Sequence, residues 1–255
     1  MMWDKRVDVL SVWKYYTAFL VFLGVVLFMR NASYSSVYWL NDGRPFVSNK
    51  AYFYLQYLTC IFVVTITAKM FGESFRVPVC EYLKSFSIST RQIVFYRYVG
   101  LLLSLIIPHT AATAILFSKV NASILDYVVI FPKYDPFPKL NILIPMTHCA
   151  IALNFYIAMT LFLMLIFREP VLPVVLIMAW CALEAGPLNR IFKHYDMFAG
   201  SFTPQDFYSF LPPNILWMLI LQPVLLGLVF IFYGKGSFLN APLQRLIIFL
   251  SRRHD

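Results

Sequence analysis

The chain has 255 residues, of which 60% are hydrophobic and 13% are charged, and its mean hydropathy is +0.72. A soluble globular domain is roughly half apolar and about a quarter charged, so the composition excludes that class and predicts an integral membrane protein. The net charge of +9 does not require a nucleic-acid partner, because the positive-inside bias of membrane proteins and the anionic headgroups of a bilayer account for it.

Six apolar runs are candidates for membrane-spanning helices, since about 20 helical residues cross ~30 Å of hydrocarbon. The predicted spans cover residues 12–29, 51–71, 98–118, 142–167, 170–185 and 211–233. Only Arg168 and Glu169 separate the fourth span from the fifth, and Pro170 suits the first turn of a new helix, which predicts a tight helical hairpin. The expected fold is therefore all-α, with one transmembrane domain over residues 1–255.

Both ends of the chain are expected to lie at the membrane surface. In residues 1–14, apolar side chains recur at helical spacing (Trp3, Val7, Leu10 and Trp13), which predicts an amphipathic helix on the inner leaflet. The last segment, residues 234–255, combines a short apolar helix face with Arg252 and Arg253. We expect it to form a basic cytoplasmic tail that anchors to the membrane.

The distribution of basic residues predicts the orientation of the spans. If both termini lie inside, the inner segments carry 13 of the 21 Lys and Arg residues and the outer segments carry the other 8. Cytoplasmic loops carry an excess of Lys and Arg, so an arrangement with both termini in the cytoplasm is favoured.

The stretch between the second and third spans is too long and too charged for a simple connection. Pro78 suits the first position of a helix, and one face of that helix would be apolar (Val79, Tyr82, Leu83 and Phe86), while Glu81 and Lys84 point elsewhere. This pattern predicts a short amphipathic helix. It fits a helix that rests on the membrane surface and equally a helix that docks into another protein.

A second helix is expected to start immediately after this short one. Ser89 and Gln92 have the spacing of a capping box, and Ile88 and Ile93 have the spacing of a hydrophobic staple. The new helix would continue through Arg91 into the third span. The segment therefore reads as a short helix, a sharp corner and then a membrane helix.

The run Glu81–Arg91, EYLKSFSISTR, follows Glu73 at the end of the second span and leads into the third. It resembles the first cytoplasmic loop of type-2 ATP-binding-cassette export permeases, which reads Glu-x-Leu, a small residue and then Pro-Ile/Val-Ser-x-Arg. Two differences from the family pattern are present. Ser87 replaces the usual proline, and residues 76–78, Arg-Val-Pro, stand where the family often has a Gly-Thr pair.

The resemblance implies that residues 74–97 form a cytoplasmic coupling segment whose helix docks onto a separate ATPase. The docking residues that it implies are Arg76, Val79, Glu81, Tyr82, Leu83, Lys84 and Phe86. It also implies a dimer with a second, identical or similar permease, ATP and Mg bound only by the ATPase subunits, and a place in the bacterial cytoplasmic membrane.

In that family the loop between the fifth and sixth spans holds short helices that re-enter the outer half of the membrane. Residues 186–212 of this chain have the aromatic content that such helices need, including Phe192, Tyr195 and Phe198. An aromatic belt at the outer interface is the alternative interpretation.

No enzyme motif is present in the sequence. A phosphate-binding loop of the GxxxxGK[ST] type, an HExxH metal motif and a GxSxG nucleophile motif are all missing from the chain. The four cysteines have no metal-ligand spacing and are expected to be free thiols packed among helices. We therefore expect no catalytic residue, no metal site and no cofactor in this chain.

Polar residues within the predicted spans are candidates for a substrate path. These candidates are Glu184, His109, Gln56 and Asn154. Each has a purely structural alternative, because such residues also form hydrogen bonds between helices, and Glu184 would reach the outer interface if the fifth span ended early. His148 has the same two interpretations.

The function expected from the resemblance is that of an exporter permease that moves an amphipathic or hydrophobic cargo, such as a peptide, a lipid-like molecule or a drug. The scarcity of charge in the spans favours that cargo class over ions or charged sugars. The alternative is an autonomous six-span protein, either a secondary carrier or a membrane scaffold, with no ATPase partner. A carrier would be expected to show inverted repeats or buried charge, and no repeat is evident.

Overall fold

The computed structural model describes residues 5–28, 36–39, 45–48, 50–75, 90–130, 141–185 and 210–233. Over these residues the chain forms six helices and one two-stranded hairpin. The helices are α1 (Lys5–Phe28), α2 (Lys50–Phe75), α4 (Thr90–Ile130), α5 (Leu143–Phe167), α6 (Val171–Ala185) and α8 (Pro213–Phe232), and the strands are β1 (Ser36–Trp39) and β2 (Pro45–Ser48).

Four of the described helices are long and apolar enough to cross a membrane, and they identify the chain as a multi-span membrane protein. They are α2, α4, α5 and α8, whose most apolar windows have mean hydropathies between 1.4 and 2.5. The apolar parts of α1 and α6 are shorter, Val12–Phe28 and Val171–Glu184. At ~1.5 Å per residue, the 15 residues of α6 extend about 22 Å, less than the ~30 Å of hydrocarbon.

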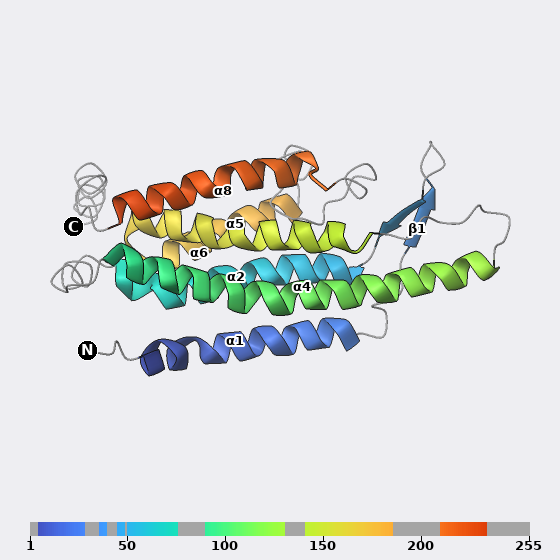
Figure 1. Ribbon diagram of the computed structural model, residues 1–255, viewed down its shortest axis with the longest axis horizontal. Coiled ribbons are helices and arrows are strands. Elements are labelled where there is room, and N and C mark those ends of the chain that lie inside the picture. Colours follow the sequence, from blue (N-terminus) through green and yellow to red (C-terminus); the bar gives the residue numbers. More distant parts are fainter. Residues whose placement is uncertain are drawn as a thin grey trace, which may run out of the picture.

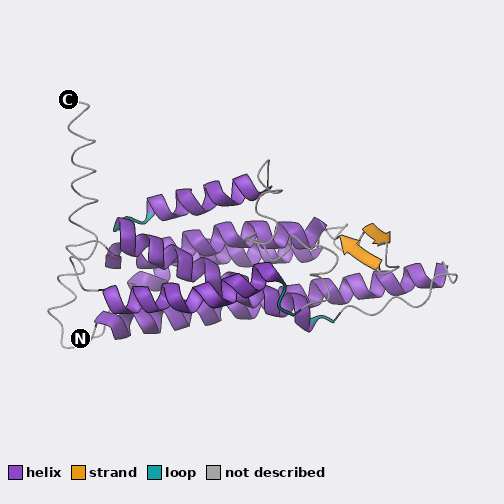
Figure 2. Ribbon diagram, turned by 90° about the horizontal axis from the view of Figure 1, so that it is seen from above, coloured by secondary structure: helices purple, strands orange, loops and turns teal. Residues whose placement is uncertain are grey.

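The helices lie along a common axis, and the start of α1 and the end of α8 lie at the same end of the bundle (Figure 1). We call this end the base and the opposite end, beside the hairpin, the distal end (Figures 1 and 2). The described helix ends nearest to the two termini, the start of α1 and the end of α8, therefore lie on the same side of the bundle. Residues 5–28 form one continuous helix, so the predicted interfacial segment and the first predicted span share α1.

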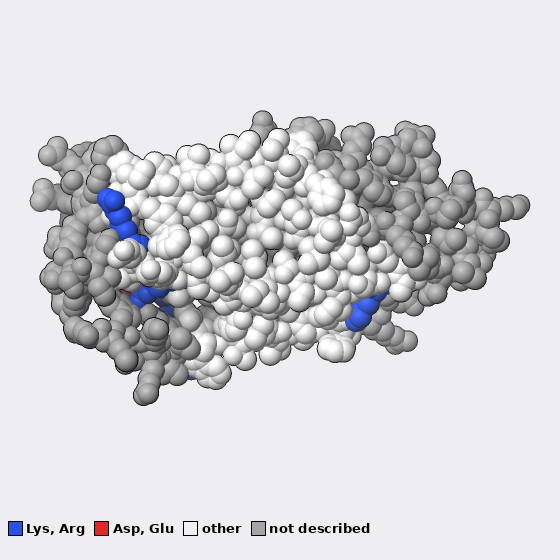
Figure 3. Space-filling model, in the orientation of Figure 1, with Lys and Arg blue, Asp and Glu red and all other residues white. Residues whose placement is uncertain are grey.

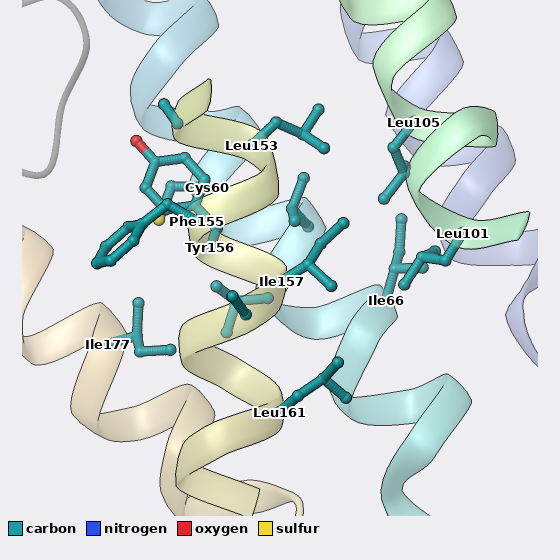
Figure 4. Close-up of a cluster of buried hydrophobic side chains, with 14 of the residues drawn as sticks. Cys60, Ile66, Leu101, Leu105, Leu153, Phe155, Tyr156, Ile157, Leu161 and Ile177 are labelled. Carbon is teal, nitrogen blue, oxygen red and sulfur yellow. The ribbon is translucent and has the colours of Figure 1, made fainter. Parts of the chain in front are cut away.

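Helix α5 occupies the centre of the bundle and packs against α2, α4, α6 and α8. Its sequence is apolar on all sides, which suits a helix that is surrounded by other helices. Figure 4 shows its side chains Leu153, Ile157 and Leu161 next to Ile66 of α2 and Leu105 of α4. The described core is therefore built around α5.

Helix α4 is much longer than the predicted third span. Its 41 residues extend about 62 Å, twice the thickness of the hydrocarbon layer. It starts at Thr90, directly after the predicted cap, and its last turns run past the bundle toward the hairpin (Figure 1). The prediction that one helix runs from this cap into the third span is thus confirmed, and the helix continues beyond residue 118, the predicted end of that span.

The hairpin between α1 and α2 was not expected, because the predicted fold is all-helical and residues 30–50 lie between the first two predicted spans. Strands β1 and β2 pair antiparallel, with Val37 opposite Val47 and Tyr38 opposite Phe46. The sequence between the strands contains Asp42-Gly43, and an Asp-Gly pair between β-branched and aromatic residues is a strong hairpin signal. The local sequence therefore contained the information that was missed.

The turn between α5 and α6 confirms the predicted helical hairpin. Arg168 adopts a left-handed conformation, with φ of 55°, and its backbone N–H bonds to the carbonyl of Met164 to end α5. The Glu169 carboxylate then accepts the backbone N–H groups of Val171 at 3.1 Å and Leu172 at 2.8 Å. This is the bonding pattern of an N-cap, and it places Pro170 in the first turn of α6 as predicted.

Three segments on which sequence-based predictions were made lie outside the described residues. They are the amphipathic helix within 76–89, most of the outer loop, 186–209, and the basic tail, 234–255.

Candidate functional site

The predicted docking residues belong to segment 76–89 and lie outside the described part of the chain. The structure does describe the helix ends that flank this segment, Phe75 of α2 and Thr90 of α4. The contacts of these two helix ends therefore describe the region to which the predicted docking segment is attached.

A group of residues at the base joins the ends of three helices, and we call it the base cluster (Ser74, Phe75, Arg97 and Tyr233). Arg97 Nη1 donates to Ser74 Oγ at 2.7 Å, and the Tyr233 hydroxyl donates to the Ser74 carbonyl at 2.9 Å. The rings of Phe75 and Tyr233 meet edge to face with centroids 5.0 Å apart. Ser74, Phe75 and Tyr233 are buried. The cluster therefore fixes α2, α4 and α8 to one another where segment 76–89 leaves and rejoins the bundle.

Two further contacts extend the fixed region around the base cluster. Arg91 Nη2 donates to the Ile231 carbonyl at 3.3 Å, so a cation lies at the end of α8, where helix carbonyls have no helical partner. In α2, a Cβ built on Gly72 would lie 2.9 Å from Cβ of Pro170, so the α5–α6 turn packs directly against α2. Five helices therefore meet within the described base.

Sequence reasoning missed the base cluster. It placed Ser74 and Arg97 at the two ends of the coupling segment and Tyr233 at the end of the sixth span, and it predicted no contact among them. A weak signal was available, because α2 and α4 are consecutive antiparallel helices and their facing ends carry Ser74 and Arg97. Nothing in the local sequence indicated that Tyr233, 159 residues away, would join them.

The second candidate region is the set of buried polar side chains inside the bundle. Gln56 of α2 donates to the sulfur of Cys149 in α5 at 2.6 Å, and the Thr113 hydroxyl of α4 lies 3.5 Å from the same sulfur. All three side chains are buried. Gln56 therefore forms the interhelical contact expected of a polar residue in a membrane bundle.

Glu184 lies on a different face of the bundle, at the distal end of α6. Its carboxylate accepts a hydrogen bond from the indole N–H of Trp180 at 2.5 Å, and only 2% of the residue is exposed. One turn away, Cys181 of α6 faces Cys60 of α2, with the two sulfur atoms 3.4 Å apart. Glu184 is thus buried among helices at the distal end of α6, and both interpretations of it, a substrate path or a position at the outer interface, stay predictions.

Asn154 links three helices near the middle of the bundle. Its side-chain oxygen accepts the Tyr98 hydroxyl of α4 at 2.5 Å, and its side-chain nitrogen donates to Gln222 of α8 at 3.0 Å. The side-chain oxygen and nitrogen of Asn154 are thus both hydrogen-bonded, which is the structural role expected for an intramembrane Asn.

The two histidines of the spans lie in different surroundings. His109 of α4 is buried, and its ring lies parallel to that of Phe19 in α1, with centroids 6.5 Å apart. Neither ring nitrogen of His109 has a hydrogen-bond partner among the described residues. His148 of α5 lies at the distal end, where Nε2 is 3.2 Å from the Phe210 carbonyl.

Gln56, His109 and Glu184 are buried and Asn154 is partly buried, but the four predicted substrate-path residues do not converge on one site. Gln56 and His109 approach the same region from α2 and α4, whereas Asn154 and Glu184 belong to separate groups. Among the described residues, no group of three or more His, Cys, Asp or Glu side chains is arranged to hold a metal ion. The interior is better described as three separate polar contacts within an apolar bundle.

Comparison with known proteins adds no assignment: the chain matches no protein-family model, and neither a curated protein nor a solved structure is significantly similar to it.

Proposed function

We propose that this chain is the membrane-spanning permease subunit of a bacterial ATP-binding-cassette exporter in the cytoplasmic membrane. The run Glu81–Arg91 supports this proposal through its resemblance to the coupling loop of type-2 export permeases. The multi-span helical architecture of the described residues is compatible with it. In this proposal the chain catalyses no reaction itself, and a separate ATPase binds ATP and Mg.

The observation that carries the proposal is the fixation of α2, α4 and α8 by the base cluster. A segment that receives force from a partner must be attached to helices that move with it. Ser74 and Arg97 are bonded to each other across the two ends of segment 76–89, and Tyr233 adds α8 to them. A displacement of the segment would therefore be transmitted to three membrane helices.

The cargo in this proposal is amphipathic or hydrophobic, such as a peptide, a lipid-like molecule or a drug. Among the described residues, Glu184 is the one buried side chain with a formal charge at neutral pH. The Lys and Arg side chains visible in Figure 3 lie toward the two ends of the molecule, and the described surface between them on the face shown has no Lys, Arg, Asp or Glu side chain. Moving a charged solute through such a bundle would leave its charge uncompensated.

The proposed assembly contains two permease chains and two ATPase subunits in a lipid bilayer, and it contains no nucleic acid. The second permease is either another copy or a similar chain. These partners follow from the family resemblance. The base cluster indicates only the end of the bundle at which an ATPase would act.

The experiment that tests the proposal is purification of the tagged chain from its native membrane in a mild detergent, followed by mass spectrometry of the bound proteins. An ATPase with a phosphate-binding loop should copurify in near-stoichiometric amount. Leu83→Ala should reduce its recovery at least about fivefold, because truncating an anchor residue of an interface costs more than about 1 kcal/mol. Lys69→Gln, an exposed position of α2, is the matched control and should leave recovery unchanged.

A second variant separates docking from coupling. Arg97→Gln removes the charged donor to Ser74 but leaves residues 76–89 intact, so the ATPase should still copurify while cargo-dependent ATP hydrolysis falls. If no ATPase is recovered with the unaltered chain, and crosslinkers at Glu81 and Lys84 also trap none, the permease proposal is wrong. The alternative, an autonomous carrier or scaffold, would then be the better description.

A further inference from the structure

Two buried polar side chains in the bundle lack the partners that their neighbours have. The Thr59 hydroxyl of α2 and both ring nitrogens of His109 have no hydrogen-bond partner within the described chain, although each residue is only 1% exposed. The other buried threonines each donate to the carbonyl four residues earlier on their own helix, and they are Thr67, Thr113 and Thr160. Because buried polar groups are nearly always hydrogen-bonded, these two exceptions need an explanation.

Thr59 and His109 lie at the same depth in the bundle. Gln56 of α2 and Thr113 of α4 both contact the sulfur of Cys149, which fixes the level at which these two antiparallel helices face each other. Thr59 is three residues after Gln56, and His109 is four residues before Thr113. Since α2 runs toward the base and α4 runs away from it, both residues lie about one turn closer to the base than the shared contact.

Helix geometry also directs the two side chains toward the same junction of helices. Around α2, Cys60 points to α6, Gln56 points to α5 and Phe62 points to α1, as their contacts show. At about 100° per residue, Thr59 lies between Gln56 and Phe62 and on the side away from Cys60. That direction leads toward α4, the remaining helix that packs against α2.

On α4, the His109 ring faces α1. It stacks on Phe19 of α1, and the Phe19 ring in turn lies 5.9 Å from Phe62 of α2. These aromatic rings cannot accept or donate hydrogen bonds of ordinary strength. The junction of α1, α2 and α4 therefore combines aromatic rings with two polar side chains that have no hydrogen-bond partner among the described residues.

We propose that this junction is a binding site for a small hydroxyl-bearing ligand held between Thr59 and His109. A neutral imidazole offers one donor and one acceptor, and a threonine hydroxyl offers both. A hydroxyl group on the ligand can donate one hydrogen bond and accept another, so it can pair with the Thr59 hydroxyl and with one ring nitrogen of His109. The hydroxyl comes either from a buried water, which typically makes about three such bonds, or from a small amphipathic molecule. The site does not depend on the proposed ATPase partner.

The test is a double-mutant cycle in which the unfolding constant of the purified chain is measured in mixed micelles without added small molecules. The variants are Thr59→Val, His109→Phe and the double variant. Because the two residues have no direct hydrogen bond, a shared ligand should appear as a coupling of about threefold or more in the unfolding constant. Thr67→Val is the matched control. When it is combined with His109→Phe, the change in the unfolding constant should equal the product of the two single changes to within about twofold.

Two further measurements distinguish the source of the hydroxyl and guard against variants that do not fold. In the parent chain, ¹⁵N shifts of the His109 ring should be those of a hydrogen-bonded imidazole and should change in Thr59→Ser less than in Thr59→Val. Coupling in the absence of additives identifies water. Coupling that emerges only with 1-hexanol, together with a rise in the parent's melting temperature, identifies a larger amphipathic alcohol. Multiplicative effects under both conditions, or ring shifts insensitive to Thr59, would overturn the proposal.

Discussion

The Tyr16 hydroxyl donates a hydrogen bond, at 2.8 Å, to the carbonyl of Ser104, which is the carbonyl that Pro108 leaves without its helical partner. A proline has no N–H to donate to the residue four positions earlier, and an unpaired carbonyl is costly in a bilayer. The side chain from α1 therefore repairs a defect inside α4. This contact also explains how a long helix keeps a proline near its middle.

Tyr16→Phe should destabilise the chain by about 1–3 kcal/mol, because it leaves the partly buried Ser104 carbonyl without this partner. The same substitution should cost clearly less in a Pro108→Ala background, since alanine restores the N–H of the helix. Unfolding in mixed micelles measures both effects. Tyr15→Phe, at an exposed position, is the control and should change little. Equal costs of Tyr16→Phe in the two backgrounds would contradict this account of the contact.

Contacts of this kind mark the limit of what the sequence could predict. The α5–α6 hairpin was predictable because Glu169 and Pro170 act within one turn, and the start of α4 was predictable from a local capping box. The bond from Tyr16 to Ser104 joins residues 88 positions apart, and no periodic pattern distinguishes Tyr16 from its neighbour Tyr15.

The candidate sites show the same division between local and long-range information. The pairing of Trp180 with Glu184 joins residues at i and i+4 of one helix and was accessible from the spacing. By contrast, the base cluster needs α8 to return beside α2, which depends on how the whole bundle packs. The sequence therefore predicted which residues are polar within the spans, but it did not predict which of them meet.

Gly72→Ala should be destabilising by about 1–3 kcal/mol, because the new methyl group would lie 2.9 Å from Cβ and 3.1 Å from Cγ of Pro170. The proline ring is rigid and cannot swing aside as a flexible side chain would. Gly100→Ala is the matched control, since no described atom lies within 4 Å of its added methyl group. That control should be neutral or stabilising by up to about 1 kcal/mol, because alanine favours the helix. Thermal unfolding in detergent compares the two, and a stabilising Gly72→Ala would show that α2 does not pack on the α5–α6 turn.

Glu169→Ala should destabilise the chain by about 1 kcal/mol, because it removes the acceptor for two backbone N–H groups at the start of α6. Glu169→Gln keeps one acceptor oxygen and should have a smaller effect. Hydrogen exchange at Val171 and Leu172 reports the cap directly and should accelerate in the order parent, Gln variant, Ala variant. An unchanged exchange rate in Glu169→Ala would mean that these N–H groups find another acceptor.

Asn154→Leu should destabilise the bundle by about 1–2 kcal/mol, because the Tyr98 hydroxyl and the Gln222 amide both lose the group that joins them. The decisive comparison uses Tyr98→Phe in two backgrounds. In the parent, Tyr98→Phe removes a hydrogen bond and should be destabilising. In Asn154→Leu, the same change removes a hydroxyl that has already lost this partner, so it should be neutral or stabilising. Unfolding by detergent titration measures the difference, and an equal cost in both backgrounds would show that Asn154 is not the partner that Tyr98 depends on.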